Sequence, residues 1–218
     1  MRVLAAVPVK DLVNAKQRLI PVLDPAERRA LAHAMLQDVL TALGAALPGS
    51  VCVVTTDPLV MDVARQYGAE CLVERANRGH TEAVAFAQEV AASRGAGRFL
   101  TIPGDVPCAS PPEIEALLGA VGGTGVVFAP SASGFGTNAA VLSPPLLMPL
   151  KFGEPSFDNH LLAARQRGLS PAVLELPGIG LDIDTPEDLE ALLARGSATR
   201  SAALLSAWGF PARLSTRR

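Results

Sequence analysis

Short apolar runs alternate with amphipathic helical patterns along most of this chain, and this alternation constrains the fold more than any other feature. Each run has the length of a strand, and each pattern places apolar residues at helical spacing. Strands that alternate with helices in this way are typical of a sheet covered by helices on both faces. We expect strands at residues 3–7, 51–55, 71–73, 99–102, 126–129 and 138–142, and helices at residues 25–43, 57–67, 81–93, 111–121 and 157–168.

The expected fold class is therefore α/β, a three-layer α/β/α domain with a mostly parallel, mixed sheet. The alternation breaks after Thr137, which indicates an inserted or antiparallel strand. A chain of 218 residues suits a single domain, residues 1–218. From about residue 196 we expect a short helical tail, with one helix at residues 199–208 and a loose, solvated end.

Composition narrows the class of protein. Hydrophobic residues make up 49% and charged residues 18% of the chain, which excludes a disordered protein. A net charge of −2 does not favour nucleic acid, and no apolar run approaches the roughly 18 residues of a membrane span. The three cysteines, Cys52, Cys71 and Cys108, lack metal-binding spacing. We expect a cytoplasmic protein that binds neither nucleic acid nor membrane.

Residues 178–189 carry the strongest functional signal. We interpret them as a short buried strand, a turn and a helix that begins at Thr185-Pro186. In a strand, Asp182 and Asp184 lie on one face, while Leu181 and Ile183 lie on the apolar face. Two adjacent carboxylates repel each other, so the pair favours a hard divalent cation such as Mg²⁺. Helix capping is the alternative; it accounts for Thr185 but not for two aspartates on one face.

Further charged residues lie where other strands end. Lys10, Lys16 and Arg18 follow the first strand, at the edge where open α/β sheets bind ligands, and three cations suit a triphosphate. A solvated basic loop is the alternative. Asp105 follows the fourth strand, where it joins Asp182 and Asp184 as a metal ligand or merely forms a turn.

Two segments are candidate anion sites. Residues 131–138 are rich in small residues that leave backbone N–H groups accessible to a phosphate. Ser156 precedes a helix, as a ligand of an anion or as an ordinary N-cap. We expect Thr81 to cap its helix and His160 to pack within the protein. No arrangement of residues suggests a covalent intermediate.

Taken together, these segments resemble the CofC/FbiD family, the 2-phospho-L-lactate guanylyltransferases of coenzyme F-420 biosynthesis. The resemblance extends from Val7 to about Leu205 and implies a Rossmann-like, glycosyltransferase-A-like nucleotidyltransferase fold. Its markers, in chain order, are Pro8-Val9-Lys10, residues 15–19, Glu27-Arg28, Asp38, residues 104–107, Gly136-Thr137-Asn138, Phe152-Gly153 with Ser156-Phe157 and His160, and residues 182–189.

The resemblance also implies roles for residues. Asp105, Asp182 and Asp184 would hold Mg²⁺, and Lys10, Lys16 and Asp105 would be catalytic. It places the nucleotide against Pro8, Val9, Lys10, Lys16, Arg18, Gly79, His80 and Gly104, and the phosphorylated acid against Thr137, Asn138, Gly153 and Ser156. The family usually has Leu-Asn where this chain has Gly79-His80-Thr81, which places the contacts to the base in question.

The implied reaction transfers GMP from GTP to the phosphate of a three-carbon acid and releases pyrophosphate. The acceptor is 2-phospho-L-lactate, phosphoenolpyruvate or 3-phospho-D-glycerate. Alternatives are a molybdopterin or sugar nucleotidyltransferase, which usually has a glycine-rich loop after the first strand, and a catalytically inactive nucleotide-binding domain. The expected partners are GTP and the phosphorylated acid, and a homodimer is left open.

Overall fold

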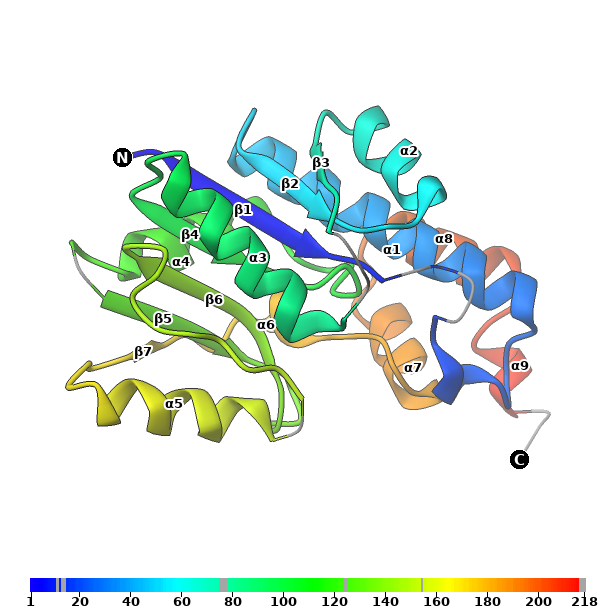
Figure 1. Ribbon diagram of the computed structural model, residues 1–218. Helices are drawn as coiled ribbons and strands as arrows, with labels where there is room; N and C mark the ends of the chain where they lie inside the picture. Colours follow the sequence, from blue (N-terminus) through cyan, green and yellow to red (C-terminus); the bar gives the residue numbers. More distant parts are fainter. Residues whose placement is uncertain (11, 13–14, 75–77, 124, 154, 216–218) are drawn as a thin grey trace.

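A computed structural model describes residues 1–10, 12, 15–74, 78–123, 125–153 and 155–215. The described chain contains a seven-stranded sheet in the order β3-β2-β1-β4-β6-β5-β7 (Figure 1). The strands are β1 Val3–Pro8, β2 Val51–Val54, β3 Glu70–Leu72, β4 Arg98–Thr101, β5 Gly125–Pro130, β6 Thr137–Ser143 and β7 Ala172–Val173. The helices are η1 Gln17–Leu19, α1 Pro25–Ala46, α2 Pro58–Gln66, α3 His80–Ser93, α4 Pro111–Ala120, α5 Ser156–Gln166, α6 Pro177–Gly180, α7 Pro186–Ala194, α8 Arg200–Ala207 and α9 Ala212–Ser215.

The sheet is mixed, as the break in alternation after Thr137 predicted. Strand β6 pairs antiparallel with both β4 and β5, whereas the other strand pairs in the described part of the chain are parallel. Strand β7 was not predicted from the sequence. It has only two residues and pairs with β5 at the edge of the sheet. A strand this short is not long enough to show an apolar periodicity in the sequence.

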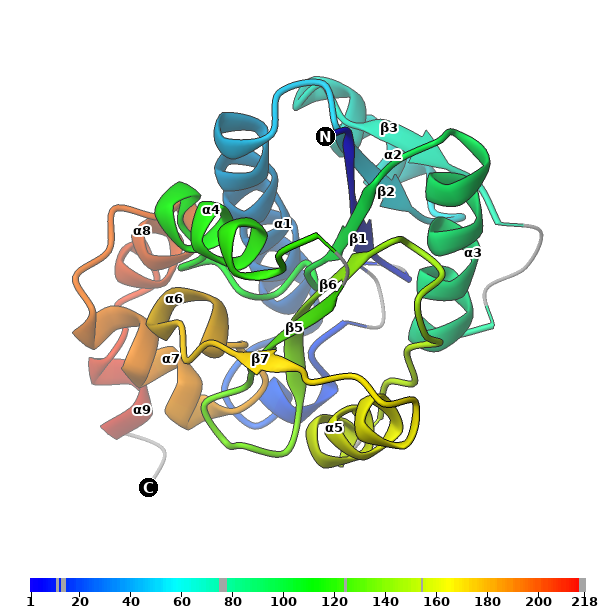
Figure 2. The ribbon, with the colours of Figure 1, turned by 90° about the vertical axis from the view of Figure 1, so that its left-hand side faces the viewer.

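Helices cover both faces of the sheet and make three layers (Figure 2). Alternate residues of each central strand enter different cores, as in β1, where Ala5 and Val7 face one core and Leu4 and Ala6 face the other. Helices α1, α2, α4, α7 and α8 pack on the first face, and α3 and α5 pack on the second. The expected α/β/α architecture is therefore confirmed.

Helix α1 begins where its sequence predicts. Asp24 accepts a hydrogen bond of 2.9 Å from the backbone N–H of Glu27, whose carboxylate accepts one of 3.0 Å from the backbone of Asp24. This reciprocal pair satisfies N–H groups that the first helical turn cannot. The helix is thereby fixed at the end closest to η1.

The tail is part of the domain. Asp38 of α1 is buried and accepts hydrogen bonds from the backbone N–H groups of Arg200 and Ser201 and from the Ser201 hydroxyl. A carboxylate at the start of α8 also complements the helix dipole. The expected loose end is wrong in part, because α9 forms and Arg213 pairs with Glu27 at 2.6 Å. Residues 216–218 lie outside the described part of the chain.

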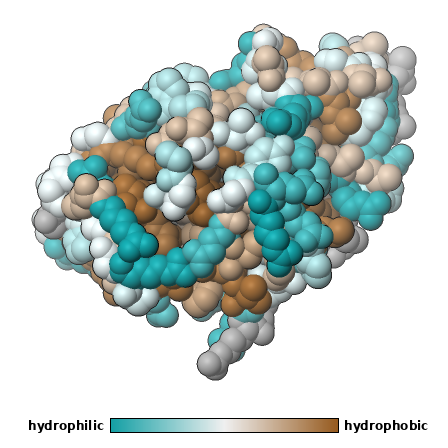
Figure 3. Space-filling view, turned by 90° about the horizontal axis from the view of Figure 1, so that it is seen from above, coloured by the Kyte–Doolittle hydropathy of each residue, from teal (hydrophilic) through white to brown (hydrophobic). Residues whose placement is uncertain are grey.

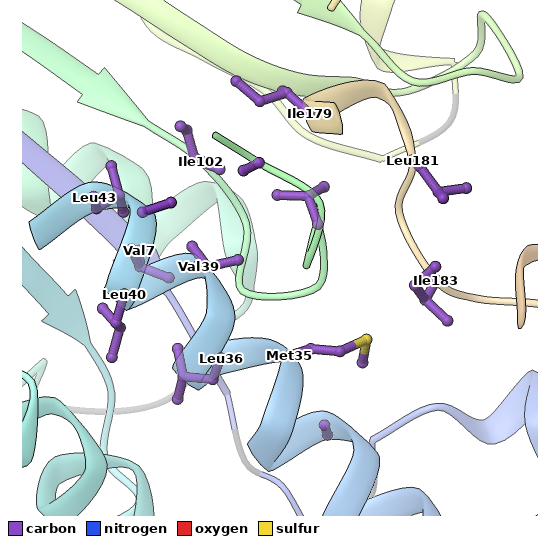
Figure 4. Close-up of a cluster of buried hydrophobic side chains, with 14 of the residues drawn as sticks. Val7, Met35, Leu36, Val39, Leu40, Leu43, Ile102, Ile179, Leu181 and Ile183 are labelled. Atoms are coloured by element: carbon purple, nitrogen blue, oxygen red, sulfur yellow. The ribbon is translucent and has the colours of Figure 1, made fainter. Parts of the chain in front are cut away.

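The strand expected to carry Asp182 and Asp184 does not form. Pro177 starts one turn of helix, α6, and the chain then continues extended without a ladder partner. A single backbone bond, from the N–H of Ile183 to the carbonyl of Asp105, joins this segment to the loop after β4. The expected alternation nevertheless holds, since Leu181 and Ile183 project into the core near Met35 (Figure 4). Asp182 and Asp184 are left half-buried at the surface.

The outer surface mixes apolar patches with hydrophilic residues on the face shown in Figure 3. Exposed apolar side chains include Leu59, Phe135 and Leu162. Among the helices that the structure describes, none combines the length and apolar character that crossing a bilayer requires.

Candidate active site

Three segments meet at the carboxyl ends of β1 and β4. These neighbouring central strands connect to opposite halves of the sheet, and such a switch point is where open α/β sheets bind ligands. The loop after β1 contributes Lys16, the loop after β4 contributes Asp105, and the segment after α6 contributes Asp184. The site is therefore assembled from distant parts of the sequence.

Lys16 lies at the centre of this junction. Its Nζ donates hydrogen bonds to Asp105 Oδ2 at 2.6 Å and to Asp184 Oδ1 at 2.8 Å. The Lys16 side chain is only 8% exposed. Burial lowers the pKa of Lys16, but the attraction of the two carboxylates outweighs it and the net shift is upward. Burial raises the pKa of Asp105, but the positive charge and the hydrogen bond of Lys16 outweigh this effect, and the net shift is downward.

The backbone of Lys16 is in the left-handed region, with φ 57° and ψ 46°. A residue with a β-carbon adopts this conformation at a cost of about 1 kcal/mol or more, and such residues concentrate at functional sites. The conformation turns the loop into η1 and directs the ammonium to the aspartates. The sequence predicted that Lys16 contributes a positive charge to the site, but it did not predict this backbone conformation.

Asp182 completes the acidic group. Its Oδ1 accepts a hydrogen bond of 3.0 Å from the amide of Asn138, which also donates to the carbonyls of Ile179 and Gly180. Burial, followed by the negative charges of Asp105 and Asp184, raises the pKa of Asp182, although the Asn138 bond opposes this shift. Burial and nearby negative charge therefore both make the charged form of Asp182 costly.

These residues fit a divalent cation by charge. Asp105 and Asp184 share the positive charge of Lys16, and their own negative charges add to the effect of burial in raising the pKa of Asp182. Carboxylate oxygens are the ligands that Mg²⁺ prefers. Within the described residues, no three acidic, histidine or cysteine side chains are arranged to hold an ion, and the Lys16 ammonium lies between two of the aspartates.

A cavity of about 330 Å³ opens beside Lys16 and Asp105. Of the residues predicted to bind nucleotide, it is also lined by Pro8, Val9, Lys10, His80 and Gly104. Gly79 adjoins it, because a Cβ built at that glycine would lie 3.8 Å from Lys10 Nζ. Arg18 is exposed on η1 and is not among the described residues that line this cavity, so its contact with the nucleotide stays a prediction.

His80 is the first residue of α3 and lies at the wall of this cavity. Burial lowers the pKa of His80 to about 4, so the ring is neutral at pH 7. Its Nε2 is buried without a hydrogen-bond partner in the described structure. A buried polar atom of this kind is costly unless a ligand or water satisfies it.

The residues predicted to bind the acid lie together at the start of β6 and α5. Ser156 Oγ accepts a hydrogen bond of 2.9 Å from the backbone N–H of Thr137, and Thr137 Oγ1 lies 2.9 Å from His160 Nδ1. Ser156 is therefore not the N-cap of α5, a position that Pro155 occupies. His160 is buried and packs against Phe128, as the sequence analysis expected.

Hydrogen bonding assigns the tautomer of His160. Its Nε2 accepts from the backbone N–H of Lys151 at 2.9 Å, so in the neutral ring the proton is on Nδ1 and is donated to Thr137 Oγ1. Burial lowers the pKa of His160 to about 4 and keeps the ring neutral. The Thr137 and Ser156 hydroxyls thus each accept one bond and keep a proton to donate, which suits an anionic ligand.

The loop over residues 131–136 is not the expected cradle of accessible N–H groups. Backbone N–H groups of Gly134 and Gly136 donate to Ser131, and that of Ala132 donates to the carbonyl of Gly180. These bonds fix the turn between β5 and β6 instead of facing a ligand. Gly153, with φ 119°, remains exposed near the start of α5.

Two features of the site were missed in the sequence. Asn138 was predicted to contact the acid, yet its amide holds Asp182 and the turn at Gly180. Thr81 was expected to cap α3, but the N-cap is Gly79, and Thr81 bonds instead to Phe152. The position of Thr81, one residue inside the helix, indicated that its hydroxyl bonds outside the helix, but its partner lies 71 residues away and could not be identified from the sequence.

The three-layer fold has a counterpart among solved structures. A crystal structure described as a nucleotide-diphospho-sugar transferase from Desulfovibrio desulfuricans G20 has the same fold, with a TM-score of 0.79 over 99% of this chain and 97% of that one. The two sequences are 16% identical, so the likeness concerns the fold alone.

The family is given by sequence. Residues 1–217 match the family described as guanylyl transferase CofC like, and the chain belongs to this family. The resemblance seen in the motifs is thereby confirmed, and the chain is an enzyme of the nucleotidyltransferase class.

Curated relatives carry three names. The chain is 42% identical to a phosphoenolpyruvate guanylyltransferase of Rubrobacter xylanophilus, over 90% of this chain and 96% of the relative. It is 36% identical to a 2-phospho-L-lactate guanylyltransferase of Methanothermobacter thermautotrophicus, over 92% and 88%. It is 34% identical to a 3-phospho-D-glycerate guanylyltransferase of Colwellia psychrerythraea, over 88% and 91%. All three relatives are named guanylyltransferases, and their names differ only in the acid.

Proposed function

We propose that this protein transfers GMP from GTP to the phosphate of a phosphorylated three-carbon acid and releases pyrophosphate, as a step of coenzyme F-420 biosynthesis. Family membership carries the proposal. The junction of Lys16 with Asp105 and Asp184 beside a cavity of about 330 Å³ supports it, because Lys16 offers a cation for a triphosphate and the carboxylates offer oxygen ligands for a divalent cation that would accompany it.

In the proposed reaction, a phosphate oxygen of the acceptor forms a bond to the α-phosphorus of GTP. The bond from that phosphorus to the bridging oxygen breaks, and pyrophosphate leaves with its electron pair. A phosphate is already largely ionised at pH 7, so the acceptor requires no general base. Negative charge grows on the leaving group, and Lys10 and Lys16, which line the cavity, would stabilise it.

We propose Mg²⁺ as the cofactor, with Asp105, Asp182 and Asp184 as the residues that would hold it. The ion would supply positive charge to the triphosphate. The protein's part is to present the carboxylates: Asn138 orients Asp182, and Lys16 holds Asp105 and Asp184 together.

The acceptor acid is proposed to bind at Thr137, Gly153 and Ser156. The hydroxyls of Thr137 and Ser156 have protons to donate to a phosphate or carboxylate oxygen. We assign Asn138 to Asp182 and not to the acid, because its amide already makes three bonds within the protein. We propose phosphoenolpyruvate as the first acid to assay, since the relative at 42% identity is named for it.

We also propose that the enzyme acts in the cytoplasm. Cys52, Cys71 and Cys108 are free thiols, which suits a reducing compartment.

The test is pyrophosphate release with GTP, Mg²⁺ and each of the three phosphorylated acids offered separately. We expect release with one acid, abolished by EDTA and restored by added Mg²⁺. The same assay with CTP, ATP and UTP checks the nucleotide. If folded protein binds GTP but releases no pyrophosphate with any of the three acids, the proposed acceptor class is wrong.

A further inference from the structure

Helix α3 is bonded to the segment that leads into the proposed acceptor site. In Figure 1 and Figure 2, the connection from β6 to α5 passes the N-terminal end of α3. Thr81 Oγ1 accepts a hydrogen bond of 2.9 Å from the backbone N–H of Phe152, and it lies 3.4 Å from the Phe152 carbonyl oxygen, to which it donates. Both backbone groups of the residue before Gly153 are therefore held by one hydroxyl.

The ring of Phe152 makes a second connection. Its centroid lies 4.3 Å from that of His80 and 5.2 Å, edge to face, from that of His160. His80 lines the proposed nucleotide cavity, and His160 bonds to Thr137 of the proposed acceptor site. Phe152 is thus packed between a residue of each site.

From these contacts we infer that Thr81 is a positioning residue for the acceptor, which holds Phe152 and so places Gly153 beside Thr137 and Ser156. The inference rests on the proposed function. Gly153 has φ 119°, a conformation with few intrinsic restraints in glycine, so the position of the exposed loop depends on the residues that flank it. On one side the start of α5 is fixed by Ser156, and on the other the chain is fixed by Thr81.

Gln88 provides an internal control on the same helix. Gln88 is buried and lies further along α3 than Thr81. Its amide donates hydrogen bonds to the carbonyls of Pro145 and Met148, which precede Phe152 in the connection from β6 to α5. Replacement of Gln88 therefore removes side-chain-to-backbone bonds of the same kind, from the same helix to the same connection, but not those at Phe152.

The experiment compares wild type with Thr81→Val, Thr81→Ser and Gln88→Leu by steady-state kinetics, with GTP and acceptor varied in turn. Loss of a hydrogen bond that leaves backbone groups unsatisfied corresponds to roughly a tenfold effect or more. We expect Thr81→Val to raise the acceptor KM about tenfold and to change the GTP KM less than about twofold. Thr81→Ser retains the hydroxyl, and its acceptor KM should stay within about threefold of wild type.

Each variant is also titrated with the acceptor by calorimetry, in the presence of a non-hydrolysable analogue of GTP. This titration checks that the change in KM is a change in affinity. Thermal unfolding checks that each variant is folded. An acceptor KM that is unchanged in Thr81→Val, that rises equally in Gln88→Leu, or that rises together with the GTP KM would overturn the inference. Wild-type enzyme that uses none of the three acids would instead overturn the proposed function, so the two failures are distinct.

Discussion

Lys16 donates a hydrogen bond of 2.6 Å to Asp105, although 89 residues separate the two in the chain. The same ammonium bonds to Asp184, so one cation joins the loop after β1, the loop after β4 and the segment after α6. Lys16 therefore has two effects: its positive charge offsets the negative charges of Asp105 and Asp184, and its hydrogen bonds hold their segments at one point.

Replacement of Lys16 separates these effects. We expect Lys16→Met to lower kcat by at least about 100-fold, because positive charge beside the leaving pyrophosphate is lost. The free energy of unfolding should fall by only about 1 kcal/mol, since Asp105 and Asp184 are 31% and 41% exposed and water screens them. Pyrophosphate release and urea unfolding measure the two effects. Lys10→Met is the control for stability: Lys10 is exposed, so the variant should lower activity with GTP and leave the free energy of unfolding unchanged.

Removal of one carboxylate charge tests the proposed metal ligands. Asp184→Asn preserves shape but weakens a hard-cation site, so turnover should be lost while the protein remains folded. Mg²⁺ dependence of the residual rate and circular dichroism are the measurements. Wild-type activity in this variant at the same Mg²⁺ concentration would contradict the assignment. Glu187→Gln, at an exposed neighbouring position on α7, is the matched control and should keep wild-type activity.

Burial of neutral His160 predicts how stability depends on pH. The unfolded chain binds a proton near pH 6.5, whereas the folded protein binds it only near pH 4. The free energy of unfolding should therefore be highest above pH 6.5 and fall by about 3 kcal/mol between pH 6.5 and pH 4 on account of this residue. Urea unfolding at several pH values measures the slope. His160→Gln should make the slope shallower without abolishing it, because buried His80, whose pKa is also lowered to about 4, contributes in the same direction. An identical slope in the variant would show that His160 is not a cause.

The tail depends on Asp38. In Asp38→Asn, an amide group cannot accept all of the bonds from residues 200 and 201, and the charge at the start of α8 is lost. We expect the free energy of unfolding to fall by about 2 kcal/mol. Asp62→Asn removes an exposed carboxylate from a surface ion pair with Arg65 and should cost less than about 0.5 kcal/mol. Equal losses in the two variants would refute a special role for Asp38.

Much of the architecture follows from local patterns. The strand and helix sequence, the break in the alternation at β6 and the start of α1 at Pro25 were all predicted, because apolar periodicity and capping residues act over a few neighbours. Strand β7 and the helical turn α6 were not predicted. Each is very short, and its conformation is decided by packing rather than propensity.

The sequence by itself determined the family, the three-layer fold and the residue types that carry charge: its motifs are local and their order is specific. Only the tertiary structure decided which side chains meet. It placed Lys16 between Asp105 and Asp184, gave Asn138 to Asp182, and joined Thr81 to Phe152. These partners lie 44 to 168 residues apart. The physical reason is that a side chain's partner depends on the register and layering of the whole sheet, which no local pattern encodes.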